Sequence, residues 1–166
     1  MNTPDMENSI PQGSWLWFWG TDFQLGSVLS VQNPLDPKDR RLLRVLATEG
    51  QTIAFYRDGF LIDGKRLHIA DMGDVNATVH RWKESYYHPD GSESSWLTQS
   101  SMQASSWTMD EIEIPKGHVF VVCDNRDQCL DSRWWGAIPE ELIVSTLRIQ
   151  LSKSDPWHQI FSFYTL

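Results

Sequence analysis

Short apolar runs separated by glycine, proline and aspartate recur along most of the chain. They include Trp15–Trp19, Gly26–Val31, Leu42–Leu46 and Val119–Val122. Runs of this length, rich in aromatic and β-branched residues and bounded by turn formers, predict β-strands. Only Pro139–Val144 suggests a helical turn, because proline is favoured at the first position of a helix. The pattern predicts a mainly β protein.

The clearest local signal is a meander of short strands. Thr52–Tyr56 leads into Asp58-Gly59, Phe60–Ile62 leads into Asp63-Gly64, and Arg66–Ile69 follows. Aspartate and glycine tolerate the positive φ angles of tight hairpin turns. We therefore expect successive antiparallel hairpins here.

The pattern is weaker elsewhere and suggests how the chain is divided. Residues 1–13 are polar and predict a flexible leader, whereas residues 14–166 predict one β domain. Residues 71–111 are serine-rich and predict a polar insertion or subdomain, with a hairpin around Tyr86 and Trp96.

Composition excludes several classes of protein. The 166 residues are 40% hydrophobic and 22% charged, which suits one folded domain. A formal net charge of −8 argues against binding nucleic acid, because phosphate neutralisation needs a basic face. The longest apolar run, Trp15–Trp19, is too short to span a membrane, and residues 1–14 lack the basic start of a signal peptide.

Nine tryptophans are a high count for this length. We expect most of them in core and sheet packing, since aromatic residues favour strands. Membrane contact and sugar stacking are the alternatives, in that order. Membrane contact would use Trp15, Trp17 and Trp19, and sugar stacking would use these three with Trp96 and Trp107.

The two cysteines, Cys123 and Cys129, lie six positions apart. This spacing is neither a disulfide framework nor a Cys-x-x-Cys metal motif, and it permits a disulfide without requiring one. The residues predict no cofactor and no metal. Cysteine usage leaves the redox compartment open.

The segment Ile114–Gly136 holds the densest group of residues with distinctive backbone or side-chain chemistry: proline, glycine, cysteine, histidine, asparagine, aspartate and arginine. It combines a turn, a buried strand and a loop of Asp, Asn and Arg side chains, which by themselves indicate a hydrogen-bonded corner. Its order resembles the carboxy-terminal signature of type I signal peptidases, or leader peptidases: Pro-x-Gly-(His/Gln)-x-Phe-(Val/Met)-(Val/Met)-Gly-Asp-Asn-Arg-Asp-x-Ser-x-Asp-Ser-Arg-(Tyr/Phe/Trp)-Trp-Gly. Cys123 stands in the place of the second Gly and Cys129 in the place of the first Ser.

Two upstream segments, Gly26–Gln51 and the meander Asp58–Lys65, are also similar to the family. The resemblance therefore covers residues 26–69 and 112–149. It implies a mostly antiparallel β domain with a variable insertion, facing the membrane outside the cytoplasm. The chain shows no signal peptide or transmembrane helix that would support this localisation.

Members of this family cleave leader peptides with a serine nucleophile and a lysine base. The lysine position, directly before Arg44, holds Leu43, which has no lone pair. Arg40, Arg41 and Arg44 cannot replace it because guanidinium stays protonated, and a solvated Lys38 stays charged at neutral pH.

The nucleophile motif Ser-Met-x-Pro-Thr is also missing, and Ser9-Ile10-Pro11 is its nearest echo. The family has a third polar partner, a serine near the lysine, and Cys129 stands in its place. The resemblance places Cys123 and Cys129 beside Leu43, either as an apolar cluster or as a disulfide. A cysteine nucleophile with His118 as its base is a rival interpretation.

The remaining signature residues resemble the family's loop-bracing polar set, and we expect Arg44 to pair with Asp131. A buried ion pair is costly to break, which would preserve the scaffold. The set comprises Arg44, Asp124, Asn125, Arg126, Asp131, Ser132 and Arg133.

Together these features predict a non-catalytic signal-peptidase-like domain. It would bind extended polypeptide, such as a preprotein, or assist a membrane-associated assembly with a partner protein. The alternative is one component of an active serine endopeptidase whose nucleophile or base comes from elsewhere. The candidate peptide-binding edge is Leu42, Leu43, Val45 and Leu46.

Overall fold

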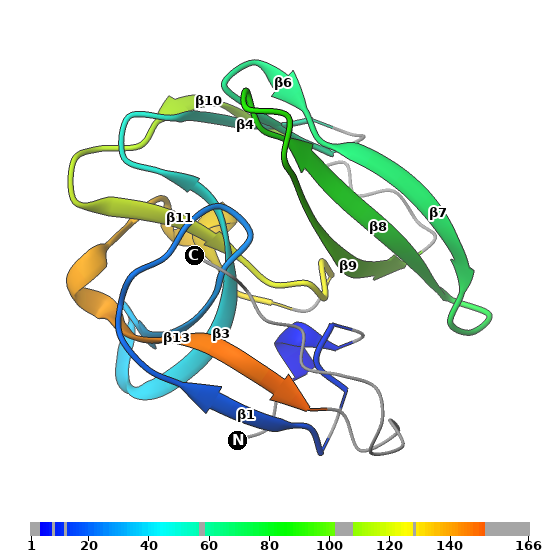
Figure 1. Ribbon diagram of the computed structural model, residues 1–166, viewed down its shortest axis with the longest axis horizontal. Coiled ribbons are helices and arrows are strands. Elements are labelled where there is room, and N and C mark those ends of the chain that lie inside the picture. Colours follow the sequence, from blue (N-terminus) through cyan, green and yellow to red (C-terminus); the bar gives the residue numbers. More distant parts are fainter. Residues whose placement is uncertain are drawn as a thin grey trace.

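The computed structural model describes residues 4–7, 9–11, 13–56, 59–101, 108–127 and 129–151. Three antiparallel sheets make up most of this part of the chain (Figure 1). The mainly β prediction is therefore confirmed. No helix among the described residues has the length and apolar character needed to cross a membrane.

The largest sheet has six strands in the order β1-β13-β2-β3-β11-β12. The long strand β3 lies between β2 and β11, so the predicted central strand Leu42–Leu46 is internal to the sheet from Arg44 onward, where β11 pairs with it. The bounds are β1 Trp15–Phe18, β2 Val28–Asn33, β3 Asp36–Thr48, β11 His118–Val122, β12 Ile138–Pro139 and β13 Ile143–Leu151.

The second sheet contains the predicted meander in the order β10-β4-β5-β6. Asp63 and Gly64 have φ angles of 51° and 71°, and they form the tight turn that the Asp-Gly pair predicts between β5 and β6. Asp58 lies outside the described residues. The bounds are β4 Thr52–Tyr56, β5 Gly59–Ile62, β6 Lys65–Arg66 and β10 Met109–Glu113.

The third sheet, β7-β8-β9, extends away from the largest sheet (Figure 1). It consists of β7 His68–Asp74, β8 Val79–Tyr87 and β9 Glu93–Ser101, and it contains the hairpin expected around Tyr86 and Trp96. The loop of residues 123–131, which follows β11, is called the signature loop below. Gln99 on β9 joins this sheet to it, because the Gln99 N–H donates to the Asp124 carbonyl and the Gln99 carbonyl accepts from the Arg126 N–H. The serine-rich segment therefore braces the loop that carries the family signature.

Three short helices complete the described chain: η1 Pro4–Met6, α1 Ser132–Trp135 and η2 Glu140–Leu142. The element η2 falls within the helical turn predicted at Pro139–Val144, whereas nothing in our sequence analysis predicted α1. The segment expected to be a flexible leader contributes Met6 and Ile10 to a buried cluster with Leu42. This part of the amino-terminal segment is thus packed into the domain.

The expected core role of Trp15, Trp17 and Trp19 was wrong. Their side chains are 64%, 43% and 53% exposed. Side chains alternate between the two faces of a strand, and in β1 it is Leu16 and Phe18 that pack against the core. Trp96 is buried as expected, and Trp107 lies outside the described residues.

Candidate functional site

The site begins at Leu43, in the middle of β3. Its side chain is fully buried and belongs to one apolar cluster with Val45, Cys123, Cys129 and Ile138. The structure therefore brings together the three degenerate positions that the signature identified. An apolar cluster around Leu43 offers no group that could accept a proton at that point.

Cys123 and Cys129 form a disulfide, which decides between the two arrangements left open by the sequence. Their Cα atoms are 6.2 Å apart, within the usual range for a disulfide. Because both sulfurs are bonded to each other, neither is available as a thiolate nucleophile or metal ligand.

The rival base, His118, lies at the opposite end of β11 from Cys123. Four residues, Val119–Val122, lie between them, so the two positions are about 16 Å apart along the strand. The His118 Nδ1 atom is 2.9 Å from the Lys116 carbonyl oxygen. The interpretation as a Cys–His pair was therefore wrong.

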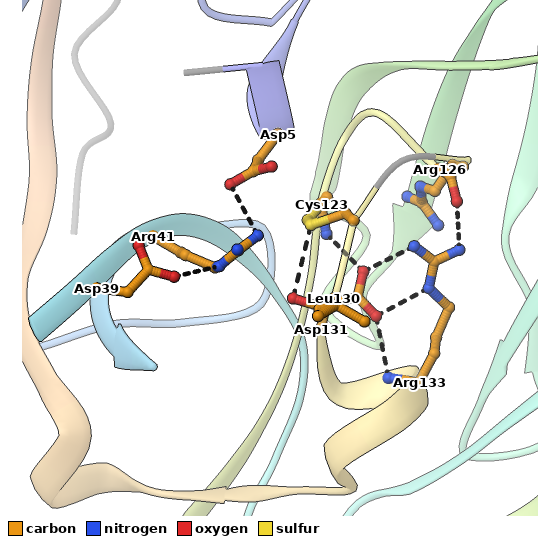
Figure 2. The surroundings of a disulfide bond; sticks show 9 residues. Asp5, Asp39, Arg41, Cys123, Arg126, Leu130, Asp131 and Arg133 are labelled. Carbon is orange, nitrogen blue, oxygen red and sulfur yellow. Dashed lines mark hydrogen bonds and ion pairs between the residues drawn. A yellow bond between two sulfur atoms is a disulfide. The ribbon is translucent and has the colours of Figure 1, made fainter. Parts of the chain in front are cut away.

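Asp5 is the site residue that the sequence analysis missed. It lies on η1, and a carboxylate oxygen of Asp5 and the two cysteine Sγ atoms are all within 4.8 Å of one another. Arg41 on β3 approaches the same carboxylate, with 3.5 Å between Nη1 and Oδ2 (Figure 2). Asp5-Met6 could have been found as an echo of the motif's Ser-Met pair, with an acid in place of the serine.

The Asp5 carboxyl has a raised pKa, mainly because burial disfavours its charged form. Arg41 opposes this effect, and the nearby carboxylates of Asp39 and Asp131 add to it. Ser9, the serine of the nearest motif echo, instead donates to the Leu97 carbonyl oxygen at 2.5 Å. The group that faces the disulfide is thus an acid, with a guanidinium beside it.

Arg44 pairs with Asp124, so the expected pairing with Asp131 was wrong. Its Nε and Nη2 atoms donate to the two carboxylate oxygens of Asp124 at 2.8 and 2.6 Å, and Nη1 donates to the Gly26 carbonyl oxygen at 2.6 Å. The two side chains are 2% and 0% exposed. The guanidinium also lies over the Trp96 ring, 5.4 Å from its centroid. This is a buried, bidentate ion pair that fixes the signature loop to β3.

Asp131 has a separate role in the same loop. Its carboxylate accepts from the Cys123 N–H at 3.0 Å, from the Arg133 guanidinium, and from the Arg133 N–H as the N-cap of α1 (Figure 2). Ser132 Oγ accepts from the Val121 N–H at 3.0 Å. These contacts hold the short helix against the end of β11 and set the position of Cys123.

Two further signature residues connect the loop to the third sheet. Arg126 pairs with the buried Glu84, which also accepts from the Trp96 indole N–H at 3.0 Å. Asn125 forms a bridge with Gln99 on β9, and its N–H donates to the Asp5 carbonyl oxygen at 2.9 Å. Glu84 was not singled out from the sequence, because its spacing from the signature carries no pattern.

The candidate peptide-binding edge is open along only part of β3. On the β2 side, the Val45 N–H donates to the Ser27 carbonyl oxygen and the Val45 carbonyl oxygen accepts from the Gly26 N–H. On the other side, β11 pairs with β3 from Arg44 to Thr48. Alternate residues of an antiparallel strand point their polar groups to opposite sides, so Arg40 and Leu42 face away from β2. No described strand pairs with β3 on that side before Arg44. The edge open to a further strand therefore lies at Arg40–Leu42, and η1 packs against β3 beside it through Asp5 and Met6.

Comparisons with known proteins agree with this geometry. A family model described as signal peptidase, peptidase S26, matches residues 1–151. Signal peptidase I of Aquifex aeolicus is 25% identical over 150 residues, covering 71% of this chain and 59% of that protein. Signal peptidase I of Haemophilus influenzae is 35% identical over 78 residues, covering 47% of this chain and 20% of that protein. The matched regions thus span at most three-fifths of these relatives.

The fold is similar to that of a solved structure, a signal peptidase I from Enterococcus faecalis V583. The TM-score is 0.50 at 19% sequence identity, and the match covers 76% of this chain and 97% of that one. At this identity the likeness supports the fold alone. With the family model covering most of the residues, the chain belongs to the signal peptidase family, peptidase S26.

Proposed function

We propose that this chain is a non-catalytic signal-peptidase-like domain that binds extended polypeptide at the open edge of β3. The observation that carries the proposal is the full burial of Leu43 among apolar side chains and the Cys123–Cys129 disulfide. Serine attack on a peptide bond needs a base that takes the hydroxyl proton. Leu43, the disulfide and the Arg41 guanidinium cannot take it. The Asp5 carboxylate can accept a proton, but it stands in the place of the motif's serine, so the nucleophile itself is missing.

Peptide binding needs no nucleophile, which is why it can outlast catalysis. An extended peptide can add to the main-chain N–H and C=O groups of Arg40 and Leu42 as a further strand. Asp5 and Arg41 lie beside this edge and would meet a neighbouring peptide with both signs of charge. By analogy with relatives named signal peptidase I, the proposed ligand is an Ala-x-Ala-type segment of a preprotein.

Replacing Arg40 by proline should weaken peptide binding roughly tenfold, because one main-chain donor is lost. Proline is tolerated in a strand where its missing N–H faces solvent, so the fold should survive. Titration of a fluorescent Ala-x-Ala peptide measures the affinity. Arg40→Ala is the matched control, since it removes the side chain and keeps the N–H. Equal affinity for both variants would exclude this edge as the binding site.

We also propose that Trp15, Trp17 and Trp19 rest on a membrane surface. The Trp15 and Trp17 rings lie 6.2 Å apart with 23° between their planes, and Ile149 and Leu151 are their register partners on β13. Register partners share one face of a sheet, so this exposed face is continuously apolar. A net charge of −8 favours a zwitterionic surface over an anionic one.

The double variant Trp15→Ala, Trp17→Ala should bind phosphatidylcholine vesicles about 10- to 100-fold more weakly, as expected for two aromatic side chains lost from an apolar contact. Vesicle co-sedimentation measures the loss. Trp134→Ala is the control, because Trp134 is 66% exposed but lies on α1. Unchanged vesicle binding together with binding to a glycan array would favour sugar stacking instead.

A further inference from the structure

The proposed strand addition at Arg40 and Leu42 does not use the contact between Asp5 and the Cys123–Cys129 disulfide. Asp5 comes from the amino-terminal segment, and its side chain is 14% exposed. Its carboxylate lies beside both sulfurs, and Figure 2 shows Asp5 next to Cys123 and paired with Arg41. Placing an acid against a disulfide costs desolvation free energy, as its raised pKa reflects.

The loop that the disulfide closes is already held by other contacts. Arg44 binds Asp124, Asp131 binds the Cys123 N–H, and the Arg133 Nη1 atom donates to the Arg126 carbonyl oxygen at 2.7 Å. A disulfide that closes so short a loop gives a smaller entropic stabilisation than one that closes a long loop. The loop should therefore keep its conformation when the disulfide is reduced.

We propose that Cys123–Cys129 is a redox-active disulfide that exchanges with a dithiol reductant, with Asp5 as the proton donor to the leaving sulfur. The exchange does not depend on the proposed peptide binding.

The exposed fractions of the two cysteines set the order of the steps. Cys129 is 9% exposed and Cys123 is fully buried, so the reductant thiolate attacks the Cys129 sulfur. The Cys123–Cys129 bond breaks, its electron pair goes to Cys123, and the Cys123 thiolate takes the proton of the Asp5 carboxylic acid. The second thiol of the reductant then attacks the mixed disulfide, and Cys129 leaves and takes that thiol's proton. Two electrons pass from the dithiol, which becomes a disulfide, and the proton released when the first reductant thiol ionised returns through solvent to the Asp5 carboxylate.

Asp5→Asn tests the proton donor, because it keeps the size of the side chain and removes the acid. We expect native-state reduction by dithiothreitol to be about 100-fold slower in Asp5→Asn than in the unmodified protein, the lower end of general acid–base contributions. Trapping of free thiols with a maleimide, followed by mass spectrometry, gives the rate. Asp90→Asn is the control and should leave the rate unchanged, since Asp90 is exposed in the turn between β8 and β9 and is not one of the charged neighbours of Asp5.

Two results would overturn the proposal. One is an equal reduction rate in Asp5→Asn and the unmodified protein. The other is reduction that occurs only after the protein unfolds, with unfolding monitored by circular dichroism. The pH dependence of the unmodified protein provides a measurement that needs no variant. After correction for reductant thiolate, the rate constant should fall as pH rises through the pKa of Asp5, whose charged neighbours are Arg41, Asp39 and Asp131. A flat profile would contradict the role of Asp5.

Discussion

Replacing Leu43 by lysine should lower the free energy of unfolding by about 4 kcal/mol at pH 7. Full burial lowers the pKa of a lysine by about 3–5 units from about 10.4, and each unit corresponds to about 1.4 kcal/mol. Leu43 is fully buried and its neighbours are apolar, so the amine would be neutral or nearly so in the folded protein at this pH. The side chain that a peptidase base requires is thus strongly destabilising in the present pocket.

The pH dependence of this variant separates a buried amine from simple mispacking. The pKa is lower in the folded than in the unfolded state, so the unfolded state binds more protons and stability rises with pH. The loss in free energy of unfolding of Leu43→Lys, relative to the unmodified protein, should therefore shrink as pH rises toward about 10, where the lysine of the unfolded state also loses its proton. Urea unfolding at several pH values measures it. Leu43→Met should cost under about 1.5 kcal/mol at every pH. A deficit in Leu43→Lys that does not change with pH would contradict the apolar pocket.

Arg44→Ala should destabilise the protein by about 3–5 kcal/mol, because it leaves the Asp124 carboxylate buried without its counter-ion. Arg40→Ala on the same strand should change stability by under about 0.5 kcal/mol, since Arg40 is exposed. Chemical denaturation of both variants gives the comparison.

A double variant tests whether the cost comes from the unpaired charge. Arg44→Leu with Asp124→Leu should be more stable than Arg44→Ala, because removal of both charges leaves no uncompensated ion. If the double variant were the less stable of the two, the pair would contribute through its shape and hydrogen bonds to Gly26 rather than through charge balance.

Much of the fold could be predicted from the residue types in short segments of the sequence. The Asp63-Gly64 turn followed from residue types that tolerate positive φ, and Leu42–Leu46 was expected as a central strand from its apolar run. The position of Leu43 beside Cys123 and Cys129 followed from the signature, since the motif fixes which strand and loop meet.

Other features depend on tertiary geometry that spacing does not encode. Asp124 and Asp131 lie in one loop near Arg44, and only the loop's path decides that Asp124 pairs with it. Asp5 reaches the disulfide from the other end of the chain, so no local pattern connects them. The run from Trp15 to Trp19 is apolar on both faces, and the sequence could not tell which face is solvent-exposed.

The central claim is that this chain binds polypeptide at the open edge of β3 without hydrolysing it. The most direct test incubates the purified chain with a preprotein at neutral pH and follows both complex formation and cleavage products by mass spectrometry. We predict a complex and no cleaved product above the background of the protein-free control. Turnover of the preprotein by this chain alone would contradict the account.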